Sequence, residues 1–327
     1  MKSEFPIDAV VTWVDGNDPT HKAARYKYSH NGEEFQYEDV ASDTRFHSVG
    51  EIKYCVASIL RFAPWIRKIY IVTDNQNPGL EEYLDRYFPD RTTPIEIIDH
   101  KVIFAGYEQY LPVFNSLSVE SMLWRIPGLS EKFLYFNDDF MLVRPVTPET
   151  FFEDGKTLVY GDWQSLCFVN FLHFFKNLFL RRNAAGYRVF LINTARLVGL
   201  RNKFLRLYHI PFAQQKRLFE EYYAEHEEVL IKNIGCRFRE PSQYNPQALN
   251  YLLGFPKKLS LLVPAQKHFV YLMPKPHRGD DYVSKKLQGF EKKTSAPFCC
   301  FNSLDKASEK DLNLILSWIH HRLGVGE

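Results

Sequence analysis

The sequence has few cysteines, and their arrangement is not that of a disulfide-stabilised protein. Five cysteines are present and none forms a C-x-x-C pair: Cys55, Cys167, Cys236, Cys299 and Cys300. An odd count, with two members adjacent in sequence, argues against a disulfide framework. The first residues, Met1–Val14, are charged and then apolar around Asp8, unlike a secretory signal peptide. Both features favour a reducing, cytoplasmic setting.

The sequence also lacks an excess of charge of either sign. Forty-one Lys and Arg face 39 Asp and Glu, which leaves a net charge of +2, and no basic run resembles a nucleic-acid-binding arm. We therefore expect no nucleic-acid partner. No internal repeat or low-complexity segment is present either. Aromatic residues, at 16%, are abundant, which fits both a sugar-binding site and an aromatic core.

No apolar run is long enough to span a membrane. The nearest candidate, Leu166–Leu180, is rich in Phe and Leu but is interrupted by Asn170, His173, Lys176 and Asn177. It is too short and too polar to cross a bilayer. Its apolar residues recur at helical spacing, which leaves two interpretations open: a helix in the core, or a helix lying at the inner face of the plasma membrane.

The first half of the chain alternates between strand-like and helix-like segments. Short apolar runs predict four strands, at Ile7–Val14, Lys68–Thr73, Ile95–Ile98 and Phe133–Phe136. Helical patterns between them include Val49–Phe62 and Asn115–Arg125. Strands separated by helices predict βαβ units, so we expect an α/β fold with a Rossmann-like, largely parallel sheet over residues 1–150.

The second half is less regular. Residues 151–265 look mainly helical, with one helix expected at Phe212–Glu225, and we interpret them as an insertion. Residues 266–327 are expected to form a loop, up to Lys293, and a C-terminal helix that closes the same domain. The apolar face of that helix consists of Leu312, Ile315, Leu316 and Ile319.

Three of the four predicted strands end in turns rich in Asp and Asn. These turns are Asp15–Pro19, Asp74–Pro78 and Asn137–Asp139. Ligands of parallel sheets collect at the carboxyl ends of the strands. Each turn can be explained by local turn chemistry alone, but the joint pattern predicts one polar crevice.

Asp138 and Asp139 are the strongest metal candidates, because both follow directly after a buried strand. Carboxylate oxygens suit Mg²⁺ or Mn²⁺, which bridge to substrate phosphates. Asp15, at the end of the first strand, either closes a local Asx-turn or contacts a ligand in the same crevice.

Three basic residues in the second half are candidates for proton transfer and phosphate binding. His209 precedes a predicted helix, and an imidazole can accept the proton of an attacking hydroxyl. Arg237 and Arg239 alternate as on an extended segment, so they are expected to share one face. Paired guanidinium groups can hold phosphate oxygens, although a salt-bridged surface explains them equally well.

Beyond these single residues, whole segments resemble the Stealth family. That family includes bacterial capsular polysaccharide phosphotransferases and the animal GlcNAc-1-phosphotransferase of lysosomal enzymes. Ile7–Asp18 resembles its first conserved region. The second is matched by Arg45-Phe46, Glu51, Ala63–Pro78, His100, Leu111–Ser116, Glu120 and Leu129–Asp139. The third conserved region is matched by His209–Pro211, Lys216, Arg237–Arg239 and Asn245. The fourth is matched more weakly, by Cys300–Asn302.

The resemblance implies a glycosyltransferase-A-like α/β domain with a helical insertion, a UDP-activated sugar donor and a divalent metal. Three positions depart from the family pattern, at Lys53, Ser242-Gln243 and Ser303. The departures leave acceptor contacts, and any metal role of the fourth region, undetermined.

Together these features predict a sugar-1-phosphate transferase that uses Mg²⁺ or Mn²⁺. An acceptor hydroxyl would attack the sugar-proximal phosphorus and release UMP, and such transfer depends mainly on positioning and charge stabilisation. The acceptor is expected to be a growing or lipid-linked surface polysaccharide. The residues assigned are Asp138 and Asp139 for the metal, His209, Arg239 and Asp139 for catalysis, and Asp15, Arg45, Asn115, Asn137 and Arg237 for the donor. The alternatives are a metal-dependent glycosyltransferase that releases UDP and a non-catalytic carbohydrate-binding protein.

Overall fold

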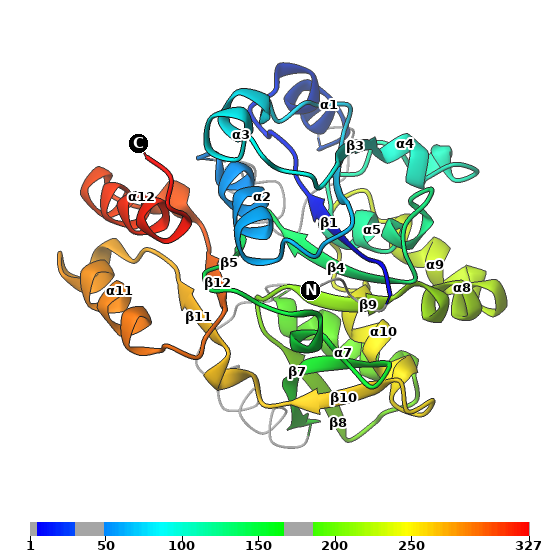
Figure 1. Ribbon diagram of the computed structural model, residues 1–327. Helices are drawn as coiled ribbons and strands as arrows, with labels where there is room; N and C mark the ends of the chain where they lie inside the picture. The colour runs from blue at the N-terminus through cyan, green and yellow to red at the C-terminus, as the bar shows by residue number, and fades with distance from the viewer. Residues whose placement is uncertain (1–4, 30–48, 167–185, 327) are drawn as a thin grey trace.

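The main sheet of the molecule has five strands, in the order β3-β2-β1-β4-β9. The computed structural model describes residues 5–29, 49–166 and 186–326 (Figure 1). The five strands are β1 (Ile7–Thr12), β2 (Ile69–Thr73), β3 (Ile95–Asp99), β4 (Lys132–Asn137) and β9 (Phe212–Gln215). The first four are parallel and β9 is antiparallel to β4. The predicted largely parallel, Rossmann-like sheet is therefore confirmed.

The central strand β1 is apolar along most of its length and is buried on both faces, as expected for an interior parallel strand. It ends at the turn Asp15–Asp18. The side chain of Asp18 accepts a hydrogen bond from the backbone N–H of His21 at 2.8 Å, which caps the next helix. Pro19 occupies the first helical position, where its missing N–H costs nothing.

Helices connect the parallel strands and cover the sheet (Figure 1). They are α1 (Pro19–Ser29), α2 (Glu51–Phe62), α3 (Glu81–Tyr87), α4 (His100–Ile103) and α5 (Ser116–Glu120). The helix expected at Asn115–Arg125 is shorter than predicted, since α5 is followed only by a 3₁₀ turn at Leu123–Arg125. Pro127 disfavours a helical conformation at Ile126, so helical structure does not continue beyond Arg125.

Among its described residues, the predicted insertion contains strands as well as helices. Its helices are α7 (Tyr187–Leu197), α8 (Lys216–Glu225), α9 (Glu227–Ile234) and α10 (Pro246–Gly254). A second sheet contains β6 (Phe152–Glu153), β7 (Lys156–Ser165), β8 (Lys203–Leu207) and β10 (Ser260–Val263).

The expected helix at Phe212–Glu225 also needs correction. Its first four residues form β9, which pairs with β4 through Tyr135 and Phe212 at one end and Lys132 and Gln215 at the other. Tertiary pairing therefore overrides the helical pattern there.

The C-terminal part adds a third sheet, in the order β11-β12-β5. Its strands are β5 (Phe140–Leu142), β11 (Phe269–Leu272) and β12 (Phe298–Phe301), flanked by α11 (Tyr282–Lys292) and α12 (Glu309–Leu323) (Figure 1). The predicted loop up to Lys293 is wrong over α11, which buries Val283, Leu287 and Phe290 at helical spacing. The predicted C-terminal helix is confirmed. The division at residues 150 and 265 stays a prediction, because β5 and β12 pair across both limits.

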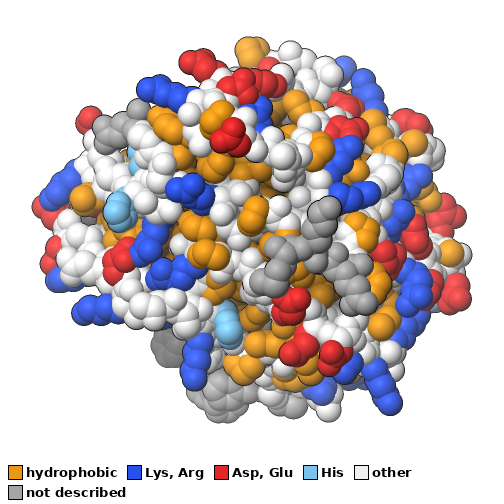
Figure 2. Space-filling view, in the orientation of Figure 1, with side chains coloured by type: hydrophobic (Ala, Val, Ile, Leu, Met, Phe, Trp, Pro, Cys, Tyr) orange, Lys and Arg blue, Asp and Glu red, His pale blue; other side chains and the backbone are white. Residues whose placement is uncertain are grey.

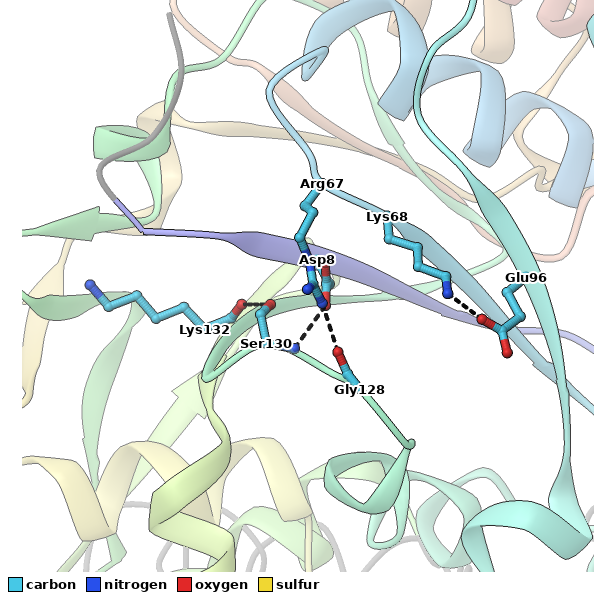
Figure 3. A network of polar contacts seen from close by, with 7 residues as sticks. All are labelled: Asp8, Arg67, Lys68, Glu96, Gly128, Ser130 and Lys132. Atoms are coloured by element: carbon cyan, nitrogen blue, oxygen red, sulfur yellow. Dashed lines mark hydrogen bonds and ion pairs between the residues drawn. The ribbon is translucent and has the colours of Figure 1, made fainter.

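An ion pair between the buried Asp8 and the partly exposed Arg67 secures the amino-terminal end of β1 (Figure 3). Asp8 is fully buried and receives two hydrogen bonds from Arg67, at 2.8 Å from Nε and 2.5 Å from a terminal nitrogen. The backbone N–H of Ser130 donates a third, at 2.8 Å. The same Arg67 donates to the carbonyl of Gly128 at 2.7 Å, so this network ties β1 to the segment that leads into β4.

Basic and acidic side chains are interspersed on the face shown in Figure 2, as the small net charge leads one to expect. Across the described ranges, no helix has both the length and the apolar character needed to span a bilayer. The segment Leu166–Leu180, apart from Leu166, lies outside the described residues, as do Arg45 and Cys167.

Candidate active site

A cleft of about 520 Å³ opens at the carboxyl ends of the parallel strands. It lies where the strand order reverses, between β1 and β4, which is where open α/β sheets bind ligands. Its volume is in the range of small-ligand sites. Its lining includes Trp13, Glu51, His100, Asn115, Ser116, Asn137, Asp138, Asp139, His209, Arg239 and Asn302.

Asp138 and Asp139 lie in this cleft, in the turn between β4 and β5. Burial raises the pKa of Asp138 well above its usual range, and the negative charges of Asp139 and Glu51 raise it further. Burial also raises the pKa of Asp139, against the opposing effect of His209. Carboxylates that burial and like charges disfavour in this way are stabilised by a nearby cation.

The C-terminal sheet fixes the orientation of Asp139. Its Oδ2 accepts hydrogen bonds from Cys300 Sγ at 3.3 Å and from Asn302 Nδ2 at 3.1 Å. Its backbone carbonyl accepts another from Phe301 N at 3.1 Å. The other carboxylate oxygen, Oδ1, is buried and has no hydrogen-bond partner in the described part of the chain. An oriented carboxylate with one unused buried oxygen is what a metal ligand requires.

The donor set suits Mg²⁺ or Mn²⁺ rather than a cation that needs an all-protein cage. Among residues 5–29, 49–166 and 186–326, no group of three or more His, Cys, Asp or Glu is arranged to hold a metal. Mg²⁺ is commonly bound through one or two carboxylates, with substrate phosphates and water completing its shell. Asp138 and Asp139 fit that pattern.

His209 reaches the same cleft from the segment before β9. Its ring packs among Tyr187, Tyr271 and Phe140, with ring centroids 5.3, 5.8 and 6.2 Å away. Burial lowers its pKa, Asp139 opposes that shift, and Arg239 adds to it. The imidazole is thus kept in the neutral form that can accept a proton.

Arg239 lines the cleft, but Arg237 does not, so the structure does not bring the two guanidinium groups together. Arg239 donates to Ser116 Oγ at 2.8 Å. Arg237 instead donates to the carbonyls of Pro112, at 2.8 Å, and Leu111, at 3.2 Å, and stacks on Tyr28. The structure therefore does not show the predicted binding of one phosphate by both arginines. Arg237 instead stabilises the segment that precedes α5.

Among the predicted donor-binding residues, Asn137 and Asn115 line the cleft. Asn137 accepts a short hydrogen bond from the Tyr135 hydroxyl. Asn115 caps α5 through Leu117 N, at 3.1 Å, and its amide nitrogen lies 2.7 Å from Gln243 Oε1. These bonds give Asn115 a structural role that the sequence did not suggest.

Asp15 is not among the lining residues. Its Oδ1 accepts from Asn17 N at 2.9 Å, which is the Asx-turn interpretation of this residue. Arg45 lies outside the described residues.

Several cleft residues were given no role from sequence. Glu51 opens α2, and its carboxylate accepts from Val49 N at 2.7 Å. Asn302 follows the apolar strand β12 just as Asp138 follows β4, so the same strand-end rule would have found it. Trp13 and His100 follow β1 and β3 in the same manner.

Two conserved-region models of one protein family match this sequence. The match to Stealth protein CR1, conserved region 1, covers residues 5–33, and that to Stealth protein CR2, conserved region 2, covers residues 45–159. The chain belongs to the Stealth family.

Relatives of this Stealth protein include named bacterial enzymes. An exopolysaccharide phosphotransferase of Streptomyces coelicolor is 33% identical over 283 residues, which cover 82% of this chain and 43% of the relative. A capsular polysaccharide phosphotransferase of Actinobacillus pleuropneumoniae is 32% identical over 243 residues, covering 73% of this chain and 62% of the relative. The chain thus spans less than two thirds of the length of either.

The solved apo structure of the bifunctional glycosyltransferase WbbM is similar in fold, with a TM-score of 0.50 and 8% sequence identity. The similarity covers 92% of this chain and 46% of that chain. The expected glycosyltransferase-A-like fold of the Stealth chain is thereby confirmed.

The two Stealth regions supply one wall of the cleft. The first contains Trp13, and the second contains Glu51, His100, Asp138 and Asp139. His209, Arg239 and Asn302 lie beyond residue 159, outside the matched regions. Their resemblance to a third and a fourth Stealth region therefore stays a prediction, but the fold places them against the first two.

Proposed function

We propose that this chain is a sugar-1-phosphate transferase. It would move hexose- or HexNAc-1-phosphate from a UDP-sugar to a glycan hydroxyl, forming a phosphodiester and releasing UMP. One observation carries the proposal: a single cleft contains Asp138, Asp139, His209 and Arg239, which come from distant parts of the chain. The names of the two relatives, an exopolysaccharide and a capsular polysaccharide phosphotransferase, support it.

The proposed step exchanges one bond to phosphorus for another. The acceptor oxygen bonds to the phosphorus next to the donor sugar. The bond from that phosphorus to the bridging oxygen breaks, and its electron pair leaves with UMP. The proton of the acceptor hydroxyl passes to the imidazole of His209, which is neutral because burial lowers its pKa. No further reactant is needed.

Arg239 would stabilise phosphate charge directly, and the acidic pair would do so through a bound cation. The guanidinium of Arg239, oriented by Ser116, would stabilise the oxygens of the transferring phosphoryl group. Asp138 and Asp139 would hold Mg²⁺ or Mn²⁺ near the diphosphate. When bound, that ion neutralises phosphate charge and favours departure of UMP.

A donor labelled at the sugar-proximal phosphorus tests the proposal directly. Label that appears in the glycan product, together with released UMP, supports sugar-phosphate transfer. Label that remains in free UDP identifies a conventional glycosyltransferase, the alternative that the fold similarity also permits. Product formation that persists in EDTA would contradict the metal requirement.

The two arginines offer a matched pair of variants. Arg239→Lys should lower kcat about 100-fold, because lysine cannot reproduce a bidentate contact to phosphate oxygens. Arg237→Lys makes the same substitution at a position where the guanidinium binds backbone carbonyls. It should leave kcat within about threefold of wild type. Equal losses of kcat in the two variants would argue against a catalytic role for Arg239.

The acceptor is proposed to be a growing or lipid-linked polysaccharide, handled on the cytoplasmic side, with peripheral contact at the membrane. The names of the two relatives support a polysaccharide acceptor in general. Co-sedimentation with vesicles that carry a lipid-linked glycan, compared with plain vesicles, tests the lipid-linked form.

A further inference from the structure

Three half-buried aromatic side chains lie in a row that ends at His209. Tyr271, on β11, packs against the His209 ring with ring centroids 5.8 Å apart. Phe269, two residues earlier on the same strand, packs against Tyr208, the residue before His209, at 4.8 Å. Residues two apart on a strand point to the same side of the sheet. Tyr208, Phe269 and Tyr271 therefore form one aromatic row.

The register of the C-terminal sheet places this aromatic row relative to the acidic pair. Tyr271 is the register partner of Cys300 on β12, whose thiol donates to Asp139 Oδ2 at 3.3 Å. Phe269 is the partner of Phe298, two residues farther from Cys300 along β12. Because a strand rises about 3.3 Å per residue, Phe269 lies roughly 7 Å beyond Tyr271. The row thus starts beside the catalytic groups and leads away from them, toward the start of β11.

Polar groups accompany the far end of the aromatic row. The hydroxyl of Tyr208 donates to Asp162 Oδ2, on β7, at 2.9 Å. Arg206, on β8, is the cross-strand partner of Asp162, and its guanidinium lies 4.8 Å from the centroid of the Tyr208 ring. Asp162 is half-buried and Arg206 is exposed. A carboxylate can accept several hydrogen bonds and a guanidinium can donate several, so both groups are able to bind a ligand as well.

This combination of rings and planar polar groups suits a carbohydrate. A pyranose has flat C–H faces that pack on aromatic rings, and hydroxyls at its edge that pair with carboxylate and guanidinium groups. A purely apolar partner would instead bury Asp162 and Arg206 without hydrogen bonds, at a cost in free energy. The aromatic row is not part of the cleft lining, whereas His209 is. The row is therefore separate from the cleft that holds the acidic pair, and meets it at the group proposed to take a proton from the attacking hydroxyl.

We propose that the acceptor glycan binds along the aromatic row. Its attacking sugar lies against Tyr271, beside His209, and the sugars farther along it lie on Phe269 and reach Asp162 and Arg206. The assignment rests on the proposed function, because it takes His209 as the group that accepts the proton of the acceptor hydroxyl. It makes Phe269 and Asp162 specificity-determining residues for acceptors longer than one sugar.

Fragments of one to about six sugars, cut from the surface polysaccharide of the cells that produce this protein, test the assignment with UMP release as the readout. In wild type, KM should be about tenfold lower for a three-sugar fragment than for the shortest active one, because only the longer fragment reaches Phe269 and Asp162. Phe269→Ala should remove most of this difference, and Asp162→Asn should reduce it about threefold. Both losses should appear in KM rather than in kcat. Thermal unfolding establishes that each variant is folded.

Phe255→Ala is the matched control. Phe255 is also half-buried, and it packs at 5.7 Å on Trp163, which neighbours Asp162 on β7 and points to the other side of that strand. This variant should keep the wild-type dependence of KM on fragment length.

Saturation-transfer NMR of the longest fragment, without donor, gives a second readout that needs no turnover. The signal seen with wild type and with Phe255→Ala should be lost in Phe269→Ala. If transfer occurs but KM does not depend on fragment length, or Phe269→Ala behaves like Phe255→Ala, the acceptor assignment is wrong and the proposed function stands. If the fragment binds through Phe269 but no UDP-sugar yields UMP, the row binds glycan and the proposed transfer is wrong. If neither binding nor transfer is seen, both are wrong.

Discussion

The two ends of the main sheet both carry aspartates, and the two sets of carboxylates differ in their partners. At the amino-terminal end, the oxygens of Asp8 are bonded to Arg67 and to Ser130 N (Figure 3). At the carboxyl-terminal end, Asp139 has one oxygen bonded to Cys300 and Asn302, and the other buried without a partner among the residues described. Among the described residues, no Lys or Arg side chain forms an ion pair with Asp139.

The difference shows that aspartate serves two purposes in the same sheet. A buried carboxylate with a complete set of donors and a cation holds the structure together. A buried carboxylate that is held by neutral donors, and has one oxygen without a hydrogen bond, lowers the stability of the ligand-free protein. That oxygen is available to bind a cation. The first kind should therefore affect stability when altered, and the second kind should affect activity.

The largest effect is expected at the carboxyl-terminal end. Asp139→Asn should lower kcat about 10³-fold or more, because it removes a charge that the proposed metal site requires. The folded state should be equally or more stable, since the change also relieves repulsion between buried carboxylates. Steady-state kinetics and chemical denaturation measure the two effects. A large loss of stability would place Asp139 in the same structural class as Asp8.

The opposite pattern is expected at Asp8. Arg67→Leu should destabilise the protein by about 3 kcal/mol, because a fully buried carboxylate loses its cation. Activity per folded molecule should stay within about twofold of wild type. Adding Asp8→Asn to Arg67→Leu should recover part of the lost stability, which a denaturant titration can detect. No recovery would mean that the ion pair is not the source of the effect.

A smaller effect on activity is expected at Asn302, which orients Asp139. Asn302→Ala should raise the Mg²⁺ concentration needed for half-maximal activity by roughly 10- to 100-fold, as for other residues that support a metal ligand. Ser303→Ala, which only removes a bond to the Asn302 side chain, is the milder control. A fall in kcat at saturating Mg²⁺, with no change in the Mg²⁺ dependence, would contradict an orienting role.

The smallest effect concerns the pH dependence of stability. The pKa of His100 is about 4 in the folded chain, because of burial, against about 6.5 when unfolded. As pH falls below 6.5, the unfolded chain takes up the proton first, so stability is lost until the pH approaches 4. Between pH 6.5 and 5 the loss should be on the order of 1 to 2 kcal/mol.

His100→Phe should remove this component, and the difference between variant and wild-type unfolding curves measures it. Asp138 and Asp139 work in the opposite sense, because their raised pKa values favour the folded state as pH falls. Only the difference between the two curves is therefore informative. Parallel curves would show that His100 is not held neutral by the fold.

Much of the sheet and of its acidic edge could be predicted from sequence. The strands of the first half are apolar and bounded by clear turns, and parallel strands bring their carboxyl ends to one edge. Asp138 and Asp139 therefore enter the cleft as predicted. The helical pattern failed at Phe212–Gln215, because pairing with β4 is a contact between distant segments that local periodicity does not encode.

The same limit applies to individual side chains. Arg237 looked like a ligand-binding residue, but it is absent from the cleft lining and donates to the carbonyl of Pro112. Asn115 lines the cleft as predicted, and its amide is also held by Gln243. Asn302 received no role from sequence, although its amide fixes Asp139 across the junction of two sheets. In each case the partner lies more than a hundred residues away, beyond the reach of spacing rules.

In the first half of the chain, local chemistry was enough to specify where the strands run, where they stop and which acidic residues stand at their ends, because turn formation and apolar patterning act over a few residues. Whether a given aspartate is neutralised by an arginine or left with an unused oxygen depends on which distant segment the fold places beside it. That choice separates Asp8 from Asp139, and it follows from three-dimensional packing.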